Sequence, residues 1–444
     1  MSSPDAVPGA AARAAGLSAT DVRARLEFLE STGHGLLESG LTSGQTEHAL
    51  ARYGLDLGVE ALSISAFGRM LILEAATHDG DTVSSSGAAR TLDAIDCTRS
   101  RELTRLAERT AHTEVARVHG HDARERLAVA KRVADRLRLT VTPWWIVALG
   151  TTMLAFFISM QVGVSWEAWV TAALVQAAAS VVGVGTTAAR MPKLFAVAVQ
   201  STVAGALATM LVQWDFVDPV GAAAAIAVNW LLLLPLPQVI GAVTDAIDGD
   251  HLSAGTRVAN VAVAAVGIVI GGTLTFALGE ALGMEHPRLD GLPAMPWYLI
   301  LVFSALGAIA NSFANGGRLN LVAPAAFLGV ATGATNQVLL SSGLPAVWAT
   351  ALAATVLGLL SARIAVRTGY PSQVLALMGV TGALLPGIPV FFGILQQMGE
   401  GSGLASFGTA GLMSLAIGIG VAFGGYLSRL VSWERTAAAG SEET

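Results

Sequence analysis

The chain contains a series of long stretches without a single Asp, Glu, Lys or Arg. A helix that crosses a bilayer needs about 18 or more mostly apolar residues, and water-soluble domains rarely contain such runs. The sequence therefore predicts a membrane protein with many spans. The stretches are residues 139–166, 168–189, 194–214, 219–244, 258–279, 291–317, 319–362, 368–399 and 401–428.

The stretch 319–362 is long enough for two helices and has a turn cluster, Ser341 to Pro345, at its middle. Splitting it there gives ten transmembrane helices. A polar loop at 281–295 divides them into two sets of five, 141–280 and 296–430, and a Pro-Trp pair opens each set, at Pro143 and Pro296. Because five is odd, two consecutive copies would face opposite ways, so we expect two inverted five-helix repeats.

The first 140 residues differ sharply, because they hold 17 of the 26 Lys and Arg residues and 19 of the 32 Asp and Glu residues. We expect a disordered N-terminus at 1–18, a small α+β domain at 19–140 and a short tail at 431–444. Residue patterns predict helices at 20–39, 43–53, 99–117 and 121–138. They predict two strands within 58–77, a third at 90–97, and a turn at Ser84 to Gly87.

Composition and motifs exclude several classes of function. The net charge is −6 and no region is strongly basic, so nucleic acid is not an expected partner. The single cysteine, Cys97, permits neither an intramolecular disulfide nor a cysteine-based zinc cluster. Phosphate-binding loops and metal-ligand spacings are missing as well, so we expect no cofactor and no metal.

Positive charges in the short loops predict the orientation. With the N-terminus inside, eight Lys and Arg residues after residue 140 fall on the cytoplasmic side, Arg257 among them, and Arg288 alone falls outside. The first thirty residues lack the apolar run of a cleavable signal. Two lysines against 24 arginines indicate a GC-rich bacterial source. We therefore expect a bacterial inner-membrane protein with both termini in the cytoplasm.

Paired prolines interrupt the fourth and ninth predicted spans. Pro235 and Pro237 lie in one, and Pro386 and Pro389 lie in the other. Proline removes a backbone donor, and hydrocarbon tolerates the freed carbonyls only beside protein or a watery cavity. Corresponding breaks in two halves indicate a binding site. The alternative is that these prolines only kink helices for packing.

Three segments carry a resemblance to a known family: HGLLESGLTSGQTEHALARYGLDLGVEAL at 34–62, PLPQVIGAVTDAIDGDHLSAGTRVAN at 235–260 and YPSQVLALMGVTGALLPGIPVFFGI at 370–394. Together they resemble the threonine/serine exporter family. The resemblance implies a ten-span inner-membrane carrier that exports small hydroxylated amino acids with the proton motive force. The implied partners are the amino-acid substrate, protons and the lipid bilayer, and homo-oligomerisation stays open.

A zwitterionic substrate needs polar partners inside the helix bundle, which broken helix ends and amide side chains can provide. The first choice is Asn229, six residues before Pro235. Asp245, at the cytoplasmic end of the fourth span, is the candidate for proton coupling. The alternatives are that the amides only tie helices together and that Asp245 belongs to a solvated loop with Asp248 and Asp250. The predicted substrate-binding residues are Asn229, Pro235, Asn260, Asn311, Asn336 and Pro386.

Two other functions remain open at this stage. The chain would be a membrane-anchored sensor or hydrolase if the activity lay in the N-terminal domain, where histidines such as His34 and the Ser84–Gly87 run permit a Ser/His/Asp set on paper. No nucleophile elbow supports that set. A passive channel is the third alternative. Small-residue pairs, Gly267 with Gly271 and Gly420 with Gly424, predict close helix packing in the fifth and tenth spans.

Overall fold

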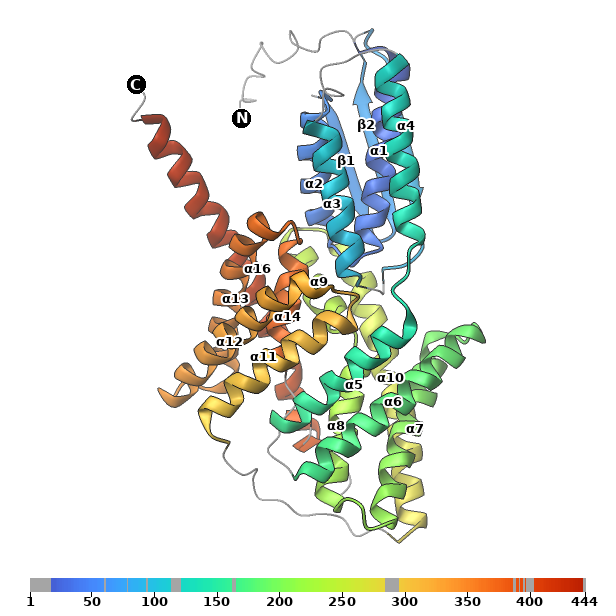
Figure 1. Cartoon of the computed structure of the whole chain (residues 1–444), viewed down its shortest axis with the longest axis vertical. Coiled ribbons are helices and arrows are strands. Elements are labelled where there is room, and N and C mark those ends of the chain that lie inside the picture. The colour runs from blue at the N-terminus through green and yellow to red at the C-terminus, as the bar shows by residue number, and fades with distance from the viewer. Residues whose placement is uncertain are drawn as a thin grey trace, which may run out of the picture. The chain divides into compact units, whose positions relative to one another are not determined.

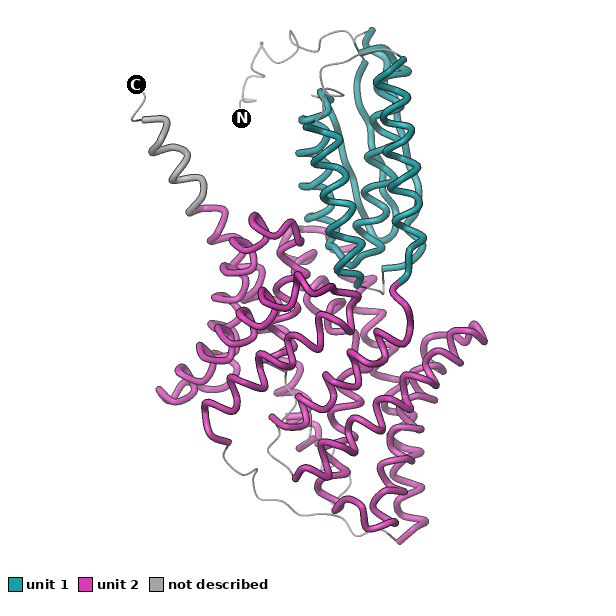
Figure 2. The backbone as a smooth tube through the Cα atoms, in the orientation of Figure 1, with its two compact units in different colours: residues 1–141 teal, residues 142–444 magenta. Residues whose placement is uncertain are grey.

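The structure is a computed structural model of the whole chain. It describes residues 17–441 except 60, 78, 93–94, 113–120, 162–164, 284–294, 386–388, 391, 394–395 and 397–402, and for 431–441 it describes only the backbone. The chain divides into two compact units, Met1–Val141 and Thr142–Thr444, shown in teal and magenta in Figure 2.

In its described residues, unit 1 combines four helices with a three-stranded antiparallel sheet of order β1-β2-β3. Burial alternates along β2, with Leu71, Leu73 and Ala75 buried, as a half-covered strand requires. Helix α1 packs on β2 and β3, and α4 packs on α1. Ser18 caps α1 by accepting the backbone N–H of Asp21. The elements are α1 Ala19–Leu37, α2 Ser43–Asp56, β1 Leu62–Phe67, β2 Met70–Ala76, β3 Thr82–Ala88, α3 Cys97–His112 and α4 His121–Leu139.

Two sequence predictions for unit 1 are wrong. The third strand is Thr82–Ala88 rather than 90–97, so the serine run predicted as a turn lies inside a strand. The reason is pairing with β2, in which Leu73 faces Ser85 across the ladder and supplies the backbone partners that a local pattern cannot reveal. Residues 93–94 of the predicted strand lie outside the described residues, and the described residues on either side are not in a strand. Asp96, directly before α3, accepts the N–H of Arg99 at 2.8 Å.

Unit 2 is built from helices (Figure 1). Among the described residues, seven of them are long and apolar enough to cross a membrane, or eight if the bent pair α8–α9 is one span. Its helices are α5 Trp144–Gln161, α6 Trp166–Ala188, α7 Lys193–Gln213, α8 Pro219–Leu233, α9 Leu236–Ile247, α10 His251–Ala281, α11 Trp297–Ala314, α12 Leu319–Ser341, α13 Ala346–Thr368, α14 Ser372–Ala383 and α16 Leu404–Ser441.

The two halves of unit 2 repeat one arrangement at a constant spacing. Helices α11, α12, α13, α14 and α16 each begin 153 residues after α5, α6, α7, α8 and α10, respectively. The packing partners also correspond, because α7 packs on α10 as α13 packs on α16. Likewise, α6 packs on α8 as α12 packs on α14. Figure 1 shows the first of these pairings as α7 beside α10 and as α13 beside α16.

The predicted break in the fourth span is confirmed. Helix α8 ends at Leu233, α9 begins at Leu236, and the two are bent by 48°. Pro235 and Pro237 have no N–H, so the helical ladder cannot continue through them. In the corresponding place of the second half, α14 ends at Ala383, and Pro386 lies outside the described residues.

The predicted packing role of the glycine pairs is also confirmed. Gly267 and Gly271 of α10 face α7 so closely that a Cβ at either position would overlap atoms of that helix. Gly420 and Gly424 of α16 do the same against α13. Because lipid provides no hydrophobic force between helices, such close backbone approach is a main source of association energy.

Replacing Gly424 by valine is therefore expected to destabilise unit 2 by about 1–3 kcal/mol, since the new side chain meets backbone atoms of Thr355 and Leu359. The matched control is Gly425→Val, because a Cβ at Gly425 meets no atom within 4 Å. Thermal unfolding in detergent compares the two variants. Equal midpoints for both would contradict the packing role.

Candidate functional site

The broken span carries a fully buried amide just before its break. Asn229 of α8 is 0% exposed, and its Nδ2 donates to the carbonyl oxygens of Ala172 in α6, at 3.1 Å, and Ala225, at 2.8 Å. Its Oδ1 is buried too and accepts no hydrogen bond from any described residue. Leaving such an acceptor unpaired costs about 1–3 kcal/mol. The side chain thus ties α8 to α6 and keeps one acceptor open to a ligand donor.

Two further buried oxygens of α6 accept no hydrogen bond from any described residue. Gln176 is one turn beyond Ala172, and its Nε2 donates to Ser180 Oγ at 3.3 Å while its buried Oε1 has no partner. Thr171 Oγ1, also buried, likewise has none. Asn229 Oδ1, at the contact of α8 with α6, and these two oxygens of α6 can each accept a hydrogen bond from a ligand donor such as an ammonium or a hydroxyl group.

A buried ion pair lies after the break. Asp245, in the last turn of α9, is 0% exposed, and Arg257, in the second turn of α10, is 1% exposed. Arg257 Nε donates to Asp245 Oδ2 at 2.7 Å, and its Nη1 donates to Gln238 Oε1 at 3.3 Å. Gln238, Gly241 and Asp245 lie on one face of α9, where a Cβ at Gly241 would come within 2.9 Å of Nη1. The missing side chain at Gly241 lets the guanidinium lie against the helix.

The loop between α9 and α10 explains why sequence reasoning missed Arg257. The solvated loop expected there is confirmed for Asp248, which is exposed. The expected cap of the following helix is confirmed for Asp250, which is half-buried and whose Oδ1 accepts the N–H of Ser253 at the start of α10. Asp245 is not part of it, since it is fully buried. Arg257, assigned to that loop by its charge, instead lies inside α10 against Asp245. Arg257 is twelve residues from Asp245 along the chain, and no local sequence pattern links residues at that separation.

The other predicted amides lie at different interfaces. Asn311 of α11 is 4% exposed, and its Nδ2 donates to Leu377 O and Thr381 Oγ1 of α14, as the helix-tying alternative requires. Asn336 of α12 has a buried Oδ1 that accepts no hydrogen bond within the described part of the chain, and Asn260 of α10 is half-buried. The structure thus places Asn229 and Asn311 at different helix interfaces and does not bring them together.

A contact that the sequence did not suggest joins the two halves. Gln161, in the last turn of α5, donates from Nε2 to the carbonyl oxygen of Gly382 in α14 at 2.8 Å. Gly382 lies 153 residues after Asn229, so it is the counterpart of Asn229 in the second half. Helices α8 and α14 therefore each have an amide at this position, supplied by Asn229 of α8 itself in the first half and by Gln161 of α5 in the second.

Comparison with known proteins gives a family for this arrangement. The model of a family described as "Putative threonine/serine exporter" matches residues 27–279 and 286–427, most of the chain. The chain belongs to the threonine/serine exporter family. A "Probable threonine/serine exporter" of Mycobacterium tuberculosis (strain ATCC 25618 / H37Rv) is 26% identical over 429 residues, which cover 92% of this chain and 76% of the relative. No solved structure matches the chain.

The match to the exporter family includes both units. It begins at residue 27, within α1 of unit 1, and it contains Asn229, Asp245 and Arg257 of unit 2. Family membership and the apolar helices together make the chain a multi-pass membrane protein. They favour a transporter over an enzyme.

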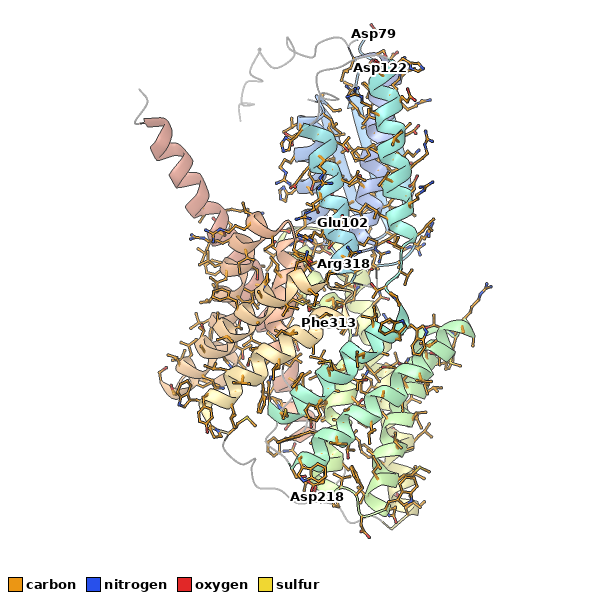
Figure 3. All side chains as sticks on the ribbon, viewed as in Figure 1. Asp79, Glu102, Asp122, Asp218, Phe313 and Arg318 are labelled. Atoms are coloured by element: carbon orange, nitrogen blue, oxygen red, sulfur yellow. The ribbon has the colours of Figure 1, made fainter. Side chains whose placement is uncertain are left out.

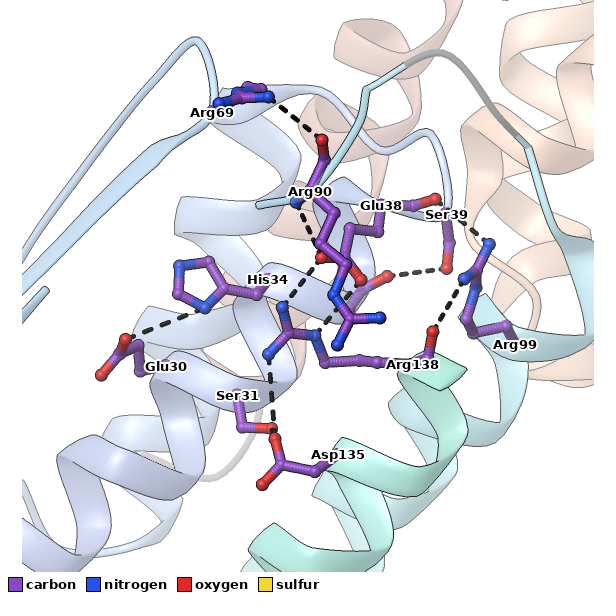
Figure 4. Close-up of polar contacts among 11 residues, drawn as sticks. Glu30, Ser31, His34, Glu38, Ser39, Arg69, Arg90, Arg99, Asp135 and Arg138 are labelled. Carbon is purple, nitrogen blue, oxygen red and sulfur yellow. Dashed lines mark hydrogen bonds and ion pairs between the residues drawn. The ribbon is translucent and has the colours of Figure 1, made fainter. Parts of the chain in front are cut away.

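Unit 1 of this exporter-family chain has its own polar cluster, centred on Glu38 (Figure 4). Glu38 is 2% exposed and accepts from Arg138 Nη2 at 2.8 Å, from Arg138 Nε at 3.2 Å and from the N–H of Arg90 at 2.9 Å. Burial alone would raise the pKa of Glu38, but these hydrogen bonds and the charges of both arginines outweigh it and lower the pKa. The cluster joins the end of α1 to the end of α4.

The hydrolase alternative requires a serine hydroxyl hydrogen-bonded to a histidine. In unit 1 a glutamate lies between the two side chains. Ser85 Oγ donates to Glu30 Oε2, and His34 Nδ1 lies 3.8 Å from Glu30 Oε1, so the carboxylate stands between the hydroxyl and the imidazole. An activated serine needs the imidazole as its immediate base. The Cys97 thiol is fully buried, and its pKa is raised by burial, so it is not a reactive nucleophile. Among the described residues, no group of metal-binding side chains is present.

Acid is expected to loosen unit 1 through His34. Burial lowers the pKa of His34 below its ordinary value, so the unfolded chain takes up a proton that the folded unit refuses. Stability is therefore complete above the ordinary pKa of histidine and falls as the pH drops below it. Hydrogen exchange of α1 amides in the full chain, between about pH 7.5 and 5.5, should show a smaller loss of protection in His34→Gln. Exposed His48→Gln is the control, and equal losses in all three proteins would refute the prediction.

Proposed function

We propose that this chain is a secondary carrier that exports threonine and serine from the cytoplasm, driven by the proton motive force. The observation that carries the proposal is the broken span α8–α9, with a buried open acceptor at Asn229 on one side of the break and a buried ion pair at Asp245 on the other. Ionisable and polar groups are retained inside a membrane bundle mainly where solutes or protons pass. The family match supports the choice of substrate.

We propose ten spans arranged as two inverted five-helix repeats. The constant spacing of 153 residues and the matching helix neighbours support this arrangement. In this count α8–α9 is the fourth span, α12 the seventh, and α14 with the residues after it the ninth. An inverted repeat provides two related conformations of one bundle, which is the basis of alternating access.

We also propose a bacterial inner-membrane location with both termini in the cytoplasm. Cationic loops on one side support this orientation. Figure 3 shows Asp218, the cap of α8, and Arg318, at the start of α12, near opposite ends of unit 2. With the N-terminus inside, the aspartate faces outward and the arginine faces the cytoplasm.

The residue roles follow from the broken spans. Asn229 contacts the substrate, Pro235 keeps the span broken, and Asp245 binds and releases the coupled proton. The remaining substrate-site residues in the proposal are Asn260, Asn311, Asn336 and Pro386. Asn311 has the additional task of holding α11 to α14.

Flux of labelled threonine in proteoliposomes, with and without an imposed pH gradient, tests the proposal. We expect saturable flux that the gradient accelerates. Saturable flux that does not depend on the gradient would contradict proton coupling. Non-saturable flux would favour a channel. If neither threonine nor serine moves under any gradient, the proposed substrate is wrong.

A further inference from the structure

The ion pair of Asp245 and Arg257 holds one charge of each sign in contact, 2.7 Å apart and shielded from solvent. An α-amino acid also carries one charge of each sign, on two groups attached to the same carbon atom. We propose that Asp245 and Arg257 separate to clamp the substrate zwitterion, with Asp245 binding the ammonium and Arg257 binding the carboxylate. The inference rests on the proposed export function and specifies how the substrate class is recognised.

Charge compensation is the physical reason for this choice of ligand. A buried charge without a partner is costly, so a buried ion pair opens only if both members find new partners. A zwitterion provides both at once, whereas a simple amine leaves Arg257 unpaired and a simple acid leaves Asp245 unpaired. The guanidinium is a planar donor fork that matches a carboxylate. The clamp therefore selects amino acids over molecules with one charge.

The helix that carries Asp245 has a break at each end. Helix α9 is twelve residues long, begins after the break at Pro235, and ends at a turn in which Gly249 has φ +89°. Only glycine adopts this backbone region readily, so the turn is a local reversal of the chain. On its other side α9 meets α16, where Val243 lies against Gly418. Movement of this short segment away from α10 would open the ion pair.

Competition between a proton and the substrate for Asp245 would couple inward proton movement to outward amino-acid movement. A proton and a substrate ammonium need the same carboxylate, so they bind alternately, and an inward proton gradient drives the amino acid outward. Arg257 of α10 is the charged group that contacts Asp245, and Asp248 of the loop is exposed. Helix α16 meets α9 on the opposite side, through apolar contact of Val243 with Gly418. When Asp245 is protonated, Arg257 keeps its hydrogen bond to Gln238.

The Asp245–Arg257 clamp and Asn229 lie at different points along the proposed transport path. Asn229 precedes Asp245 by 16 residues, or roughly 20 Å along the bent α8–α9 pair at about 1.5 Å per residue. A single small amino acid cannot span that distance. With the proposed orientation, the clamp receives the substrate near the cytoplasmic end and Asn229 contacts it deeper in the bundle.

Competition by one-charge analogues tests the clamp in the unmodified protein. Exchange of labelled threonine in proteoliposomes is measured with unlabelled threonine, threonine amide, which lacks the carboxylate, or N-acetylthreonine, which lacks the ammonium. We expect threonine to compete and both analogues to be at least about a hundredfold weaker, equivalent to about 2.7 kcal/mol. Competition by either analogue at threonine concentrations would overturn the clamp.

A second measurement tests the shared carboxylate. The apparent KM for threonine should rise as the pH falls on the cytoplasmic face of the wild type, because protons displace the ammonium from Asp245. Because Asp245→Asn is not expected to transport, threonine binding to the purified variants is measured by titration calorimetry over the same pH range: binding to Asp245→Asn should be weaker and lack this pH dependence, whereas Asp248→Asn, which changes a nearby exposed carboxylate, should keep it. A retained pH dependence in Asp245→Asn would overturn the clamp. If the wild type moves no threonine or serine, the export proposal itself fails, which is a separate outcome.

Discussion

Replacing Arg257 by glutamine is expected to lower the free energy of unfolding of unit 2 by about 3–5 kcal/mol, the usual cost of removing one partner of a buried ion pair. The Asp245 carboxylate would remain 0% exposed without its guanidinium, and Gln238 would lose the Nη1 donor as well. The measurement is the thermal unfolding midpoint of the purified chain in detergent. We also expect threonine flux to fall to background.

The double variant Asp245→Asn with Arg257→Gln separates charge imbalance from loss of shape. The asparagine and glutamine side chains are neutral and can hydrogen-bond to each other. Most of the lost stability should therefore return, whereas transport should not. Asp248→Asn is the control, because that carboxylate is exposed. A double variant less stable than both single variants would mean that the pair acts mainly through packing.

Asn229→Leu is expected to raise the KM for threonine by about 10- to 100-fold, because the variant removes the unpaired Oδ1 that is proposed to accept a substrate donor. Leucine has the same branching and the same number of side-chain heavy atoms as asparagine, so it is a close apolar match in shape, although its methyl groups are larger. The loss of the Nδ2 hydrogen bond to Ala172 should cost only about 1 kcal/mol of stability. Initial rates over a range of threonine concentrations measure the KM.

Gln200→Leu is the matched control for Asn229→Leu. Gln200 of α7 is another amide in the bundle, but it is only half-buried and its Nε2 donates to Ala196 of its own helix. We expect its KM to equal that of the wild type. An unchanged KM in Asn229→Leu, or an equal rise in Gln200→Leu, would show that Asn229 only ties α8 to α6.

The membrane class of the chain, the break at Pro235 and the glycine contacts of α10 and α16 were predictable from sequence. Each depends on a local rule: hydrocarbon excludes unpaired charges and backbone donors, proline cannot continue a helix, and glycine lets two helix backbones approach closely. The four helices of unit 1 and its first two strands were predictable for the same reason. Their capping residues and periodicities lie within the segments themselves.

The strand Thr82–Ala88 was not predictable in this way. Its sequence, TVSSSGA, is typical of a turn, and it becomes a strand because the edge of β2 provides hydrogen-bond partners along its whole length. The contact of Gln161 with Gly382 was missed for a similar reason. Its two residues are 221 positions apart and meet only when α5 and α14 pack together.

The sequence by itself determined that this protein is a membrane-embedded, largely helical chain of the threonine/serine exporter family with a charged N-terminal region. Only the tertiary structure decided which polar groups are paired. Asn229 keeps an open acceptor while the Nδ2 donor of Asn311 is paired, and Asp245 is buried against Arg257 while Asp248 is exposed. Residue type fixes what a side chain can donate or accept, but its partners come from helices that pack together in three dimensions, and local spacing does not encode that packing.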